Sequence, residues 1–240
     1  MKEKHAIGID VGGTNTKFGT VNKKGVILVQ DRIKTNEHEN VEAFIDDLAE
    51  KLNPMIEQYG GPEAFLGIGM GAPNANYYQG TIEYAANLKW KGIIPMAELL
   101  EQKFKIPAKL TNDANAAAFS ELWYGPINEA NIRTLLFVLV VEGLGTGLII
   151  NGELHVGSRM GPGGFGHMSI DLNGELCSCG RRGCWETFAS ERATVERFHR
   201  VTAKQGLPFA SLSEIISLAN KNDEMALQSL KITAEYLGEG

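Results

Sequence analysis

The cysteines of this 240-residue chain are concentrated in one short stretch that also holds a histidine. Three thiolates and one imidazole make a complete tetrahedral shell for a zinc ion, and glycines between them let the chain turn back toward one metal. Cysteines scattered through a core would not be confined to one stretch, which disfavours thiols without a metal. Because four protein ligands leave no open coordination position, we expect a structural zinc that holds a loop in place. The predicted ligands are His167, Cys177, Cys179 and Cys184.

A disulfide is a weaker interpretation of the same residues. The number of cysteines is odd, and Cys177 and Cys179 are too close in sequence to pair easily with each other. Cysteines arranged for a metal are typical of a reducing compartment, and the first residues, MKEKHAIGID, contain no signal-peptide hydrophobic region. We therefore expect a cytoplasmic protein.

The composition is that of an ordinary globular protein, with 43% hydrophobic and 22% charged residues. The net charge of −6 disfavours a nucleic-acid or anionic-membrane partner, so we expect neither. The longest apolar run, residues 135–141, is too short to span a membrane and is predicted to be a buried strand. The length allows one large domain or two modest ones.

A glycine turn follows the first predicted strand, residues 5–10, and leads into further strands at 16–21 and 26–33. This order differs from the strand–helix order of Walker and Rossmann phosphate loops. Its glycines still allow backbone N–H groups to approach a phosphate, and a carboxylate at the strand end would hold magnesium through water. The alternative is an ordinary hairpin with a surface lysine. The candidate phosphate and magnesium residues are Asp10, Gly12, Gly13, Thr14 and Lys17.

A second glycine turn, residues 143–147, lies between predicted strands at 133–141 and 148–151. The chain thus holds two units of strand, glycine turn and strand. Two such turns facing phosphate fit a nucleotide clamp. We expect Gly143, Gly145 and Thr146 to belong to the nucleotide site.

Polar residues precede a predicted helix that reaches residue 124. Asp113 either caps this helix or accepts the proton of a substrate hydroxyl, as the carboxylate does in phosphoryl transfer. Asn87 is either a sugar ligand or a turn residue that satisfies its own backbone, and the local sequence favours the turn. Further helices are predicted at 40–58, 95–104, 185–205, 211–220 and 223–237.

Five motifs occur together, and their combination resembles the ROK family of repressors, uncharacterised reading frames and sugar kinases, in its bacterial glucokinase-like branch. They are DVGGTNTKFG (10–19), NDANAAA (112–118), GLGTGLIING (143–152), GHM (166–168) and CSCGRRGCWE (177–186). The resemblance covers essentially the whole chain. It implies an actin-like, ribonuclease-H-like α/β fold in two domains around a cleft, which we expect at 1–111 and 112–240.

The same resemblance implies transfer of the γ-phosphate of ATP, with magnesium, to a hydroxyl of a hexose, glucose first, by a homodimer or homotetramer. Asp113 matches the catalytic base of the family. His167 would bind zinc through one ring nitrogen and a sugar hydroxyl through the other, so that the metal orients the donor. The implied sugar-binding residues are Asn87, Asn112, Asp113, His167 and Glu186.

Two residues depart from the family pattern. A gapless alignment places Glu142 where the family has a threonine that serves a phosphate; the alternative alignment takes residues 145–147 as that motif and requires a deletion before Ile149. Gly164 replaces the glutamate of the family's E-x-G-H motif. Both departures favour the alternative function, a non-catalytic or weakly active sugar-binding regulator.

The ends of the chain give two further expectations. Family members continue for several dozen residues beyond the motif YLGxG, whereas this sequence stops at Gly240, so we expect a C-terminally short large domain. The family's repressors carry a helix-turn-helix before the first strand, and only residues 1–4 precede it here. Direct DNA recognition is therefore not expected.

Overall fold

The computed structural model describes residues 4–85, 87–126, 131–156, 164–203 and 208–240, and it divides into two compact units. Unit 1 comprises Met1–Leu135 and Leu148–Gly161, and unit 2 comprises Leu136–Gly147 and Pro162–Gly240. These units do not follow the predicted division after residue 111, because helix α3 (Asp113–Tyr124) packs against strand β4 (Phe65–Gly71) of unit 1.

Unit 1 is built on a five-stranded sheet in the order β3-β2-β1-β4-β8. β1 pairs antiparallel with β2 and β2 with β3, whereas β4 runs parallel to β1 and β8 runs parallel to β4. The predicted strands on both sides of the first glycine turn are therefore confirmed. The remaining strands of this sheet are β1 (His5–Val11), β2 (Asn15–Val21), β3 (Ile27–Lys34) and β8 (Ala108–Thr111).

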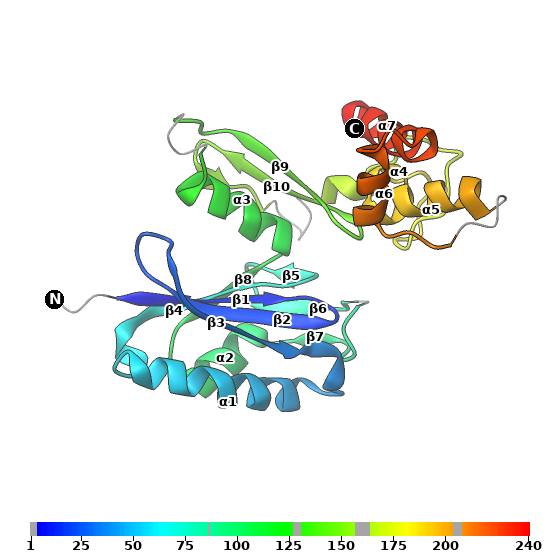
Figure 1. The fold of residues 1–240 in the computed structure, drawn as a ribbon. Coiled ribbons are helices and arrows are strands. Elements are labelled where there is room, and N and C mark those ends of the chain that lie inside the picture. The colour runs from blue at the N-terminus through cyan, green and yellow to red at the C-terminus, as the bar shows by residue number, and fades with distance from the viewer. Residues whose placement is uncertain (1–3, 86, 127–130, 157–163, 204–207) are drawn as a thin grey trace. The chain divides into compact units, whose positions relative to one another are not determined.

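One face of this sheet is covered by α1 (Val41–Gln58) and α2 (Met96–Phe104), and α3 lies over the other (Figure 1). Alternation along β1 turns Ile7 and Ile9 into the core under α1. The apolar stripe of α1 is fully buried there, as its spacing predicts. Burial of each such side chain stabilises the fold by about 1.5–3 kcal/mol. Smaller elements complete the unit: η1 (Thr35–Glu37), η2 (Pro62–Ala64), β5 (Ala75–Asn76), β6 (Thr81–Glu83) and β7 (Ile93–Ile94).

Unit 2 contains the turn between β9 (Leu135–Val140) and β10 (Leu144–Ile150), the cysteine loop and the last helices. β9, β10 and β11 (Glu153–Leu154) form a three-stranded sheet in the order β11-β10-β9, of which β11 and the end of β10 from Leu148 belong to unit 1. After the short helix η3 (Gly164–His167) and the cysteine loop, the chain is helical, with α4 (Glu186–Ala189), α5 (Glu191–Thr202), α6 (Leu212–Ala219) and α7 (Glu224–Glu239).

The predicted helix 185–205 is wrong in one respect, because it is broken after Ala189. Ser190 has extended backbone angles, and its side chain accepts a hydrogen bond from the backbone N–H of Ala193, so it caps α5. A hydrogen bond joins α7 to the start of α4: the indole N–H of Trp185, the N-cap of α4, donates to the carbonyl of Tyr236 in α7 over 2.6 Å. This contact fixes the start of α4, next to the last of the three cysteines.

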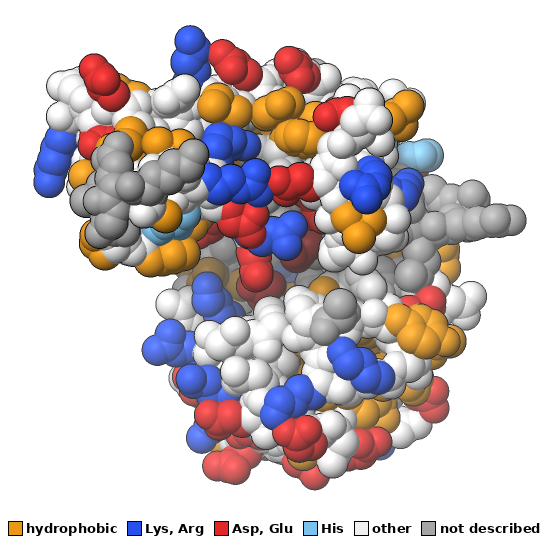
Figure 2. All heavy atoms as spheres, turned by 90° about the vertical axis from the view of Figure 1, so that its right-hand side faces the viewer, with side chains coloured by type: hydrophobic (Ala, Val, Ile, Leu, Met, Phe, Trp, Pro, Cys, Tyr) orange, Lys and Arg blue, Asp and Glu red, His pale blue; other side chains and the backbone are white. Residues whose placement is uncertain are grey.

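The surface carries both signs of charge. Figure 2 shows acidic and basic side chains interspersed on the face that it displays. Within the described part of the chain, no helix combines the length and the apolar character needed to cross a membrane.

Candidate functional site

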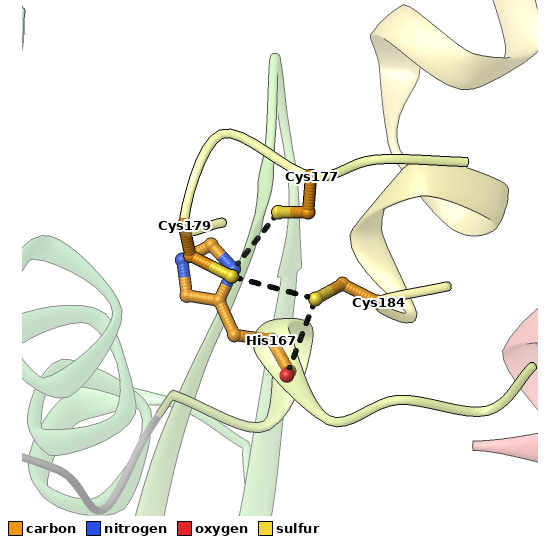
Figure 3. A group of neighbouring side chains, drawn as sticks. All are labelled: His167, Cys177, Cys179 and Cys184. Carbon is orange, nitrogen blue, oxygen red and sulfur yellow. Dashed lines mark hydrogen bonds between the residues drawn. The ribbon is translucent and has the colours of Figure 1, made fainter. Parts of the chain in front are cut away.

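The four predicted zinc ligands lie together in unit 2 (Figure 3), and their ligand atoms are all within 4.8 Å of one another. The sulfurs of Cys179 and Cys184 are 3.6 Å apart, and Cys177 Sγ is 3.5 Å from His167 Nδ1. Ligands at zinc-bond distances and tetrahedral angles are separated by roughly 3.5–3.8 Å, so these contacts match a zinc shell. All three cysteines are free thiols. The residues therefore fit the predicted metal.

The loop reverses direction where the sequence places glycine. Gly183 has φ 62°, and a Cβ there would lie 1.5 Å from the carbonyl oxygen of Asp171. Gly180 has φ 86°, and its N–H donates to the Cys177 carbonyl over 2.9 Å. A side chain would strain both positions, so the expectation that glycine allows these reversals is confirmed.

The thiols differ in their surroundings. Burial raises the pKa of Cys177 to about 12, and its S–H donates to Glu186 Oε1 over 3.0 Å. Burial also raises the pKa of Cys179, but hydrogen bonds from the backbone and side chain of Arg181 outweigh it and lower the pKa to about 7. Because a metal-bound cysteine is a thiolate, Cys179 is the ligand that gives up its proton most readily.

We predict one zinc ion per chain in protein purified without added zinc. Cys179→Ser removes a thiolate from a four-ligand shell, so metal analysis should show most of the zinc lost. Asn173→Ala, an exposed residue of the same loop that is not one of the four ligands, is the matched control and should keep about one equivalent. A full complement of zinc in a Cys177→Ser/Cys179→Ser double variant would contradict the assignment.

A second group of charged residues meets in unit 1, where β1 and β4 end and α3 begins. Asp10 lies at the end of β1, directly opposite Lys17 on β2. A Cβ built on Gly71, at the end of β4, would be 4.0 Å from Asp10 Oδ1 and 3.7 Å from the Cα of Asp113. Burial raises the pKa of Asp10, the charge of Asp113 raises it further, and Lys17 lowers it. Two carboxylates this close to each other suit a magnesium ion.

Beside this group, a pocket of about 1260 Å³ lies between the sheet and α3. Asp10, Lys17 and Thr111 are among the residues that line it, with Trp123 and Tyr124 from α3. Ligands of α/β proteins bind at the carboxyl ends of parallel strands, where Asp10 and Thr111 lie. The predicted Asp10, Lys17 and Asp113 are therefore brought together in one unit.

The position at which α3 begins decides between the two interpretations of Asp113, helix cap or proton acceptor. Asn112 is the N-cap, because its side-chain oxygen accepts from the Asn115 N–H over 2.7 Å. Asp113 is the first helical residue; it is exposed, and its Oδ1 accepts from the adjacent Ala114 N–H over 2.8 Å. The capping interpretation of Asp113 is therefore wrong, and any sugar contact of Asn112 would come from its amide nitrogen.

The glycines of the first turn are required by close packing, because a side chain at either position would contact neighbouring backbone. A Cβ on Gly12 would lie 2.9 Å from the carbonyl oxygen of Asn15, and a Cβ on Gly13 would lie 2.9 Å from that of Asn87. Asn87 itself is exposed. Gly13 thus lets the predicted phosphate turn lie against the predicted sugar residue Asn87, while the exposed Thr14 remains accessible.

The second glycine turn is shorter than the sequence suggested. β10 begins at Leu144, so Gly145 and Thr146 are strand residues and the turn itself ends at Gly143. Thr146 is fully buried, and its hydroxyl accepts from the Phe165 backbone N–H over 3.2 Å. In this structure Thr146 supports the start of η3 and does not face solvent, because alternation in β10 turns it inward.

Glu186 lies against the zinc ligands. It is 9% exposed, and its Oε1 is 3.3 Å from His167 Nδ1 as well as 3.0 Å from Cys177 Sγ. The sequence did not predict this contact, although Glu186 follows Cys184 by two positions. The predicted sugar-binding residues are divided between the units: Asn87, Asn112 and Asp113 belong to unit 1, and His167 and Glu186 to unit 2.

The ROK family model matches residues 6–240. The chain belongs to the ROK family. This ROK chain is 32% identical over 240 residues to the xylose repressor of Bacillus subtilis, and it is 30% identical over 253 residues to the glucokinase of Halalkalibacterium halodurans. The match covers 100% of the chain and 60% of the repressor, and 99% of the chain and 75% of the glucokinase.

Solved structures agree with this membership. The ROK family glucokinase of Streptomyces griseus, in complex with glucose and AMPPNP, matches with a TM-score of 0.79 and 28% identity, over 98% of this chain and 77% of that one. The predicted α/β fold of the ROK sugar kinases is thereby confirmed. The chain spans 60% of the length of the two Bacillus xylose repressors that it matches, and its curated relatives include both sugar kinases and repressors.

Proposed function

We propose that this chain binds a hexose, glucose first, and transfers the γ-phosphate of ATP to one of its hydroxyls. One observation supports the proposal most directly: Asp10, Lys17 and Asp113 lie close together around Gly71, at the ends of β1 and β4. Two carboxylates and a lysine close together are what phosphoryl transfer requires for positioning and charge neutralisation. The glucokinase relatives support the same chemistry.

Each residue of the group would have a distinct role. Asp113 would accept the hydrogen bond of the sugar hydroxyl and orient it, held by the Ala114 N–H. Lys17 would donate to phosphate oxygens, with the backbone N–H of Gly13, whereas the Gly12 N–H donates to the Asn15 carbonyl over 3.0 Å. Asp10 would hold magnesium, which when bound would neutralise charge on the phosphates.

The proposed hexose ligands are Asn87 and the Asn112 amide of unit 1, with His167 and Glu186 of unit 2. With Nδ1 of His167 turned to the cysteines, Nε2 would serve the sugar. A cytoplasmic location and a homodimer or homotetramer are part of this proposal, by analogy with the family.

A second candidate is a sugar-binding regulator with little or no turnover. Two observations favour it: Glu142 and Gly164 replace residues that would serve phosphate and sugar, and the xylose repressors are relatives at 32% identity over the whole chain. Under this function the sugar still binds, and its binding is the signal.

A coupled assay of ADP formation with glucose, mannose, fructose, xylose and N-acetylated hexoses tests the proposal, with calorimetry of each sugar beside it. We expect ADP formation that depends on a hexose, glucose most strongly, and that requires magnesium. Saturable sugar binding without ADP formation would favour the regulator. If none of these sugars binds and none is phosphorylated, both candidate functions are contradicted.

A further inference from the structure

The turn that carries Asn87 is a closed loop of unit 1. Its two ends are joined, because the Tyr84 N–H donates to the Gly92 carbonyl over 2.8 Å. Between these ends, the side chains of Leu88 and Trp90 are buried in the core of the unit, whereas Asn87 is exposed. The loop is therefore anchored by its apolar residues and leaves Asn87 accessible.

The ammonium group of Lys91 is bonded to this loop on both sides of Asn87. It donates to the Ala85 carbonyl over 3.1 Å and also to the carbonyl of Leu88, the residue after Asn87. The Leu88 N–H donates to the Ala85 carbonyl over 3.4 Å, so the same two residues are also joined through the backbone. A hydrogen bond from a charged donor is stronger than one between neutral groups. Lys91 thus holds the chain on either side of Asn87.

The position of Asn87 matters because the first glycine turn lies directly against it. A Cβ on Gly13 would lie 2.9 Å from the Asn87 carbonyl oxygen and 3.5 Å from its Nδ2. The amide proposed to bind the hexose is therefore beside the turn proposed to bind phosphate. A small displacement of a group that positions the substrate can cost a large factor in rate or affinity, so the loop has to hold Asn87 in place.

Lys89, two positions before Lys91, has a different kind of partner. Its ammonium group pairs with the carboxylate of Glu39, which precedes α1 and lies outside the loop. Both lysines are exposed and carry the same charge. The difference between them is that Lys91 donates to carbonyls of the loop itself, so Lys89 offers a matched comparison.

We propose that Lys91 is a positioning residue for sugar binding: its ammonium group fixes the loop on both sides of Asn87 and so holds the Asn87 amide beside the phosphate turn. The inference rests on the function proposed above, in which Asn87 is a sugar ligand, and it applies equally to the kinase and to the sugar-binding regulator. Lys91 acts through Asn87. A loop that is ordered in advance binds its ligand more tightly, because it does not have to be ordered on binding.

The test is the glucose affinity of Lys91→Met, measured by calorimetry. Methionine has a similar length but no donor, so we expect the affinity to fall about fivefold to tenfold. In the turnover assay the KM for glucose should rise by the same factor, while kcat and the KM for ATP stay close to those of the parent. Lys91→Arg keeps a charged donor and should restore most of the affinity. Lys89→Met is the matched control and should bind glucose as the parent does.

Asn87→Ala decides whether Lys91 acts through Asn87. In this background the amide is gone, so adding Lys91→Met should cause little further loss of glucose affinity. An equal loss with and without the Asn87 amide would overturn the proposal, and so would unchanged affinity in Lys91→Met alone.

Hydrogen exchange of the loop supplies a readout that needs no ligand. The backbone N–H groups of Tyr84 and Leu88 should exchange faster in Lys91→Met, because the loop opens more easily, and at the parent rate in Lys89→Met. Unchanged exchange would overturn the proposal. Circular dichroism checks folding; if Lys91→Met does not fold, Lys91→Gln, which is shorter and uncharged, takes its place in every measurement. If the parent binds no sugar, the proposed function fails, whereas hydrogen exchange still decides whether Lys91 orders the loop.

Discussion

Asp113→Asn is expected to lower the rate of phosphoryl transfer by about 10²–10⁴-fold while sugar binding stays measurable. Asparagine has the same shape and can still accept from the Ala114 N–H, so the geometry at the start of α3 is kept. It cannot accept the proton of the attacking hydroxyl. The helix cap is supplied by Asn112 and is untouched, so the free energy of unfolding should change little.

Steady-state turnover with glucose and calorimetric glucose affinity separate these effects. Glu121→Gln, near the other end of α3, removes the same charge from the same helix and should leave both constants close to those of the parent. Turnover of Asp113→Asn equal to that of the parent would remove Asp113 from the chemistry. Loss of sugar binding together with turnover would make it a sugar ligand first.

The metal cluster could be predicted in full because its information is local and chemically specific. His167 and the cysteines are few, close in sequence and separated by glycine, and only a small set of metals takes three thiolates and an imidazole. The strands at 16–21 and 26–33 were predicted for a similar reason, since Asn22 and Gly25 between them are typical turn residues. Neither prediction needed knowledge of distant contacts.

The remaining features depend on register and on contacts across the chain. Asn112 and Asp113 are both good caps, and only the helix start shows which one is used. Thr146 looked accessible in a glycine-rich stretch, but strand alternation turns it inward under Phe165. Helical periodicity runs through Ser190, so the break there was not visible in the hydrophobic pattern. Glu186 contacts Cys177 only because the loop folds back.

Changing two residues toward the family pattern is expected to raise activity by more than any other substitution. Gly164→Glu restores a carboxylate that would accept hydrogen bonds from the sugar. Among the described residues the site has room, because a Cβ on Gly164 meets none of their atoms within 4 Å. Hydrogen bonds to charged groups contribute roughly 1.5–3 kcal/mol, so sugar affinity should rise by about one to two decades. ATP affinity should stay unchanged.

Glu142→Thr is expected to act on ATP and not on the sugar. Glu142 is exposed in the turn between β9 and β10, beside Gly143, where a phosphate would approach under the gapless alignment. Two like charges about 4 Å apart at an effective dielectric near 20 repel by roughly 4 kcal/mol, which is nearly three decades before relaxation, and magnesium offsets part of it. A coupled assay on the parent, both single variants and the double variant separates the two constants. High parent activity that neither change alters would show that the turn does not face the phosphates and that the missing carboxylate is supplied elsewhere.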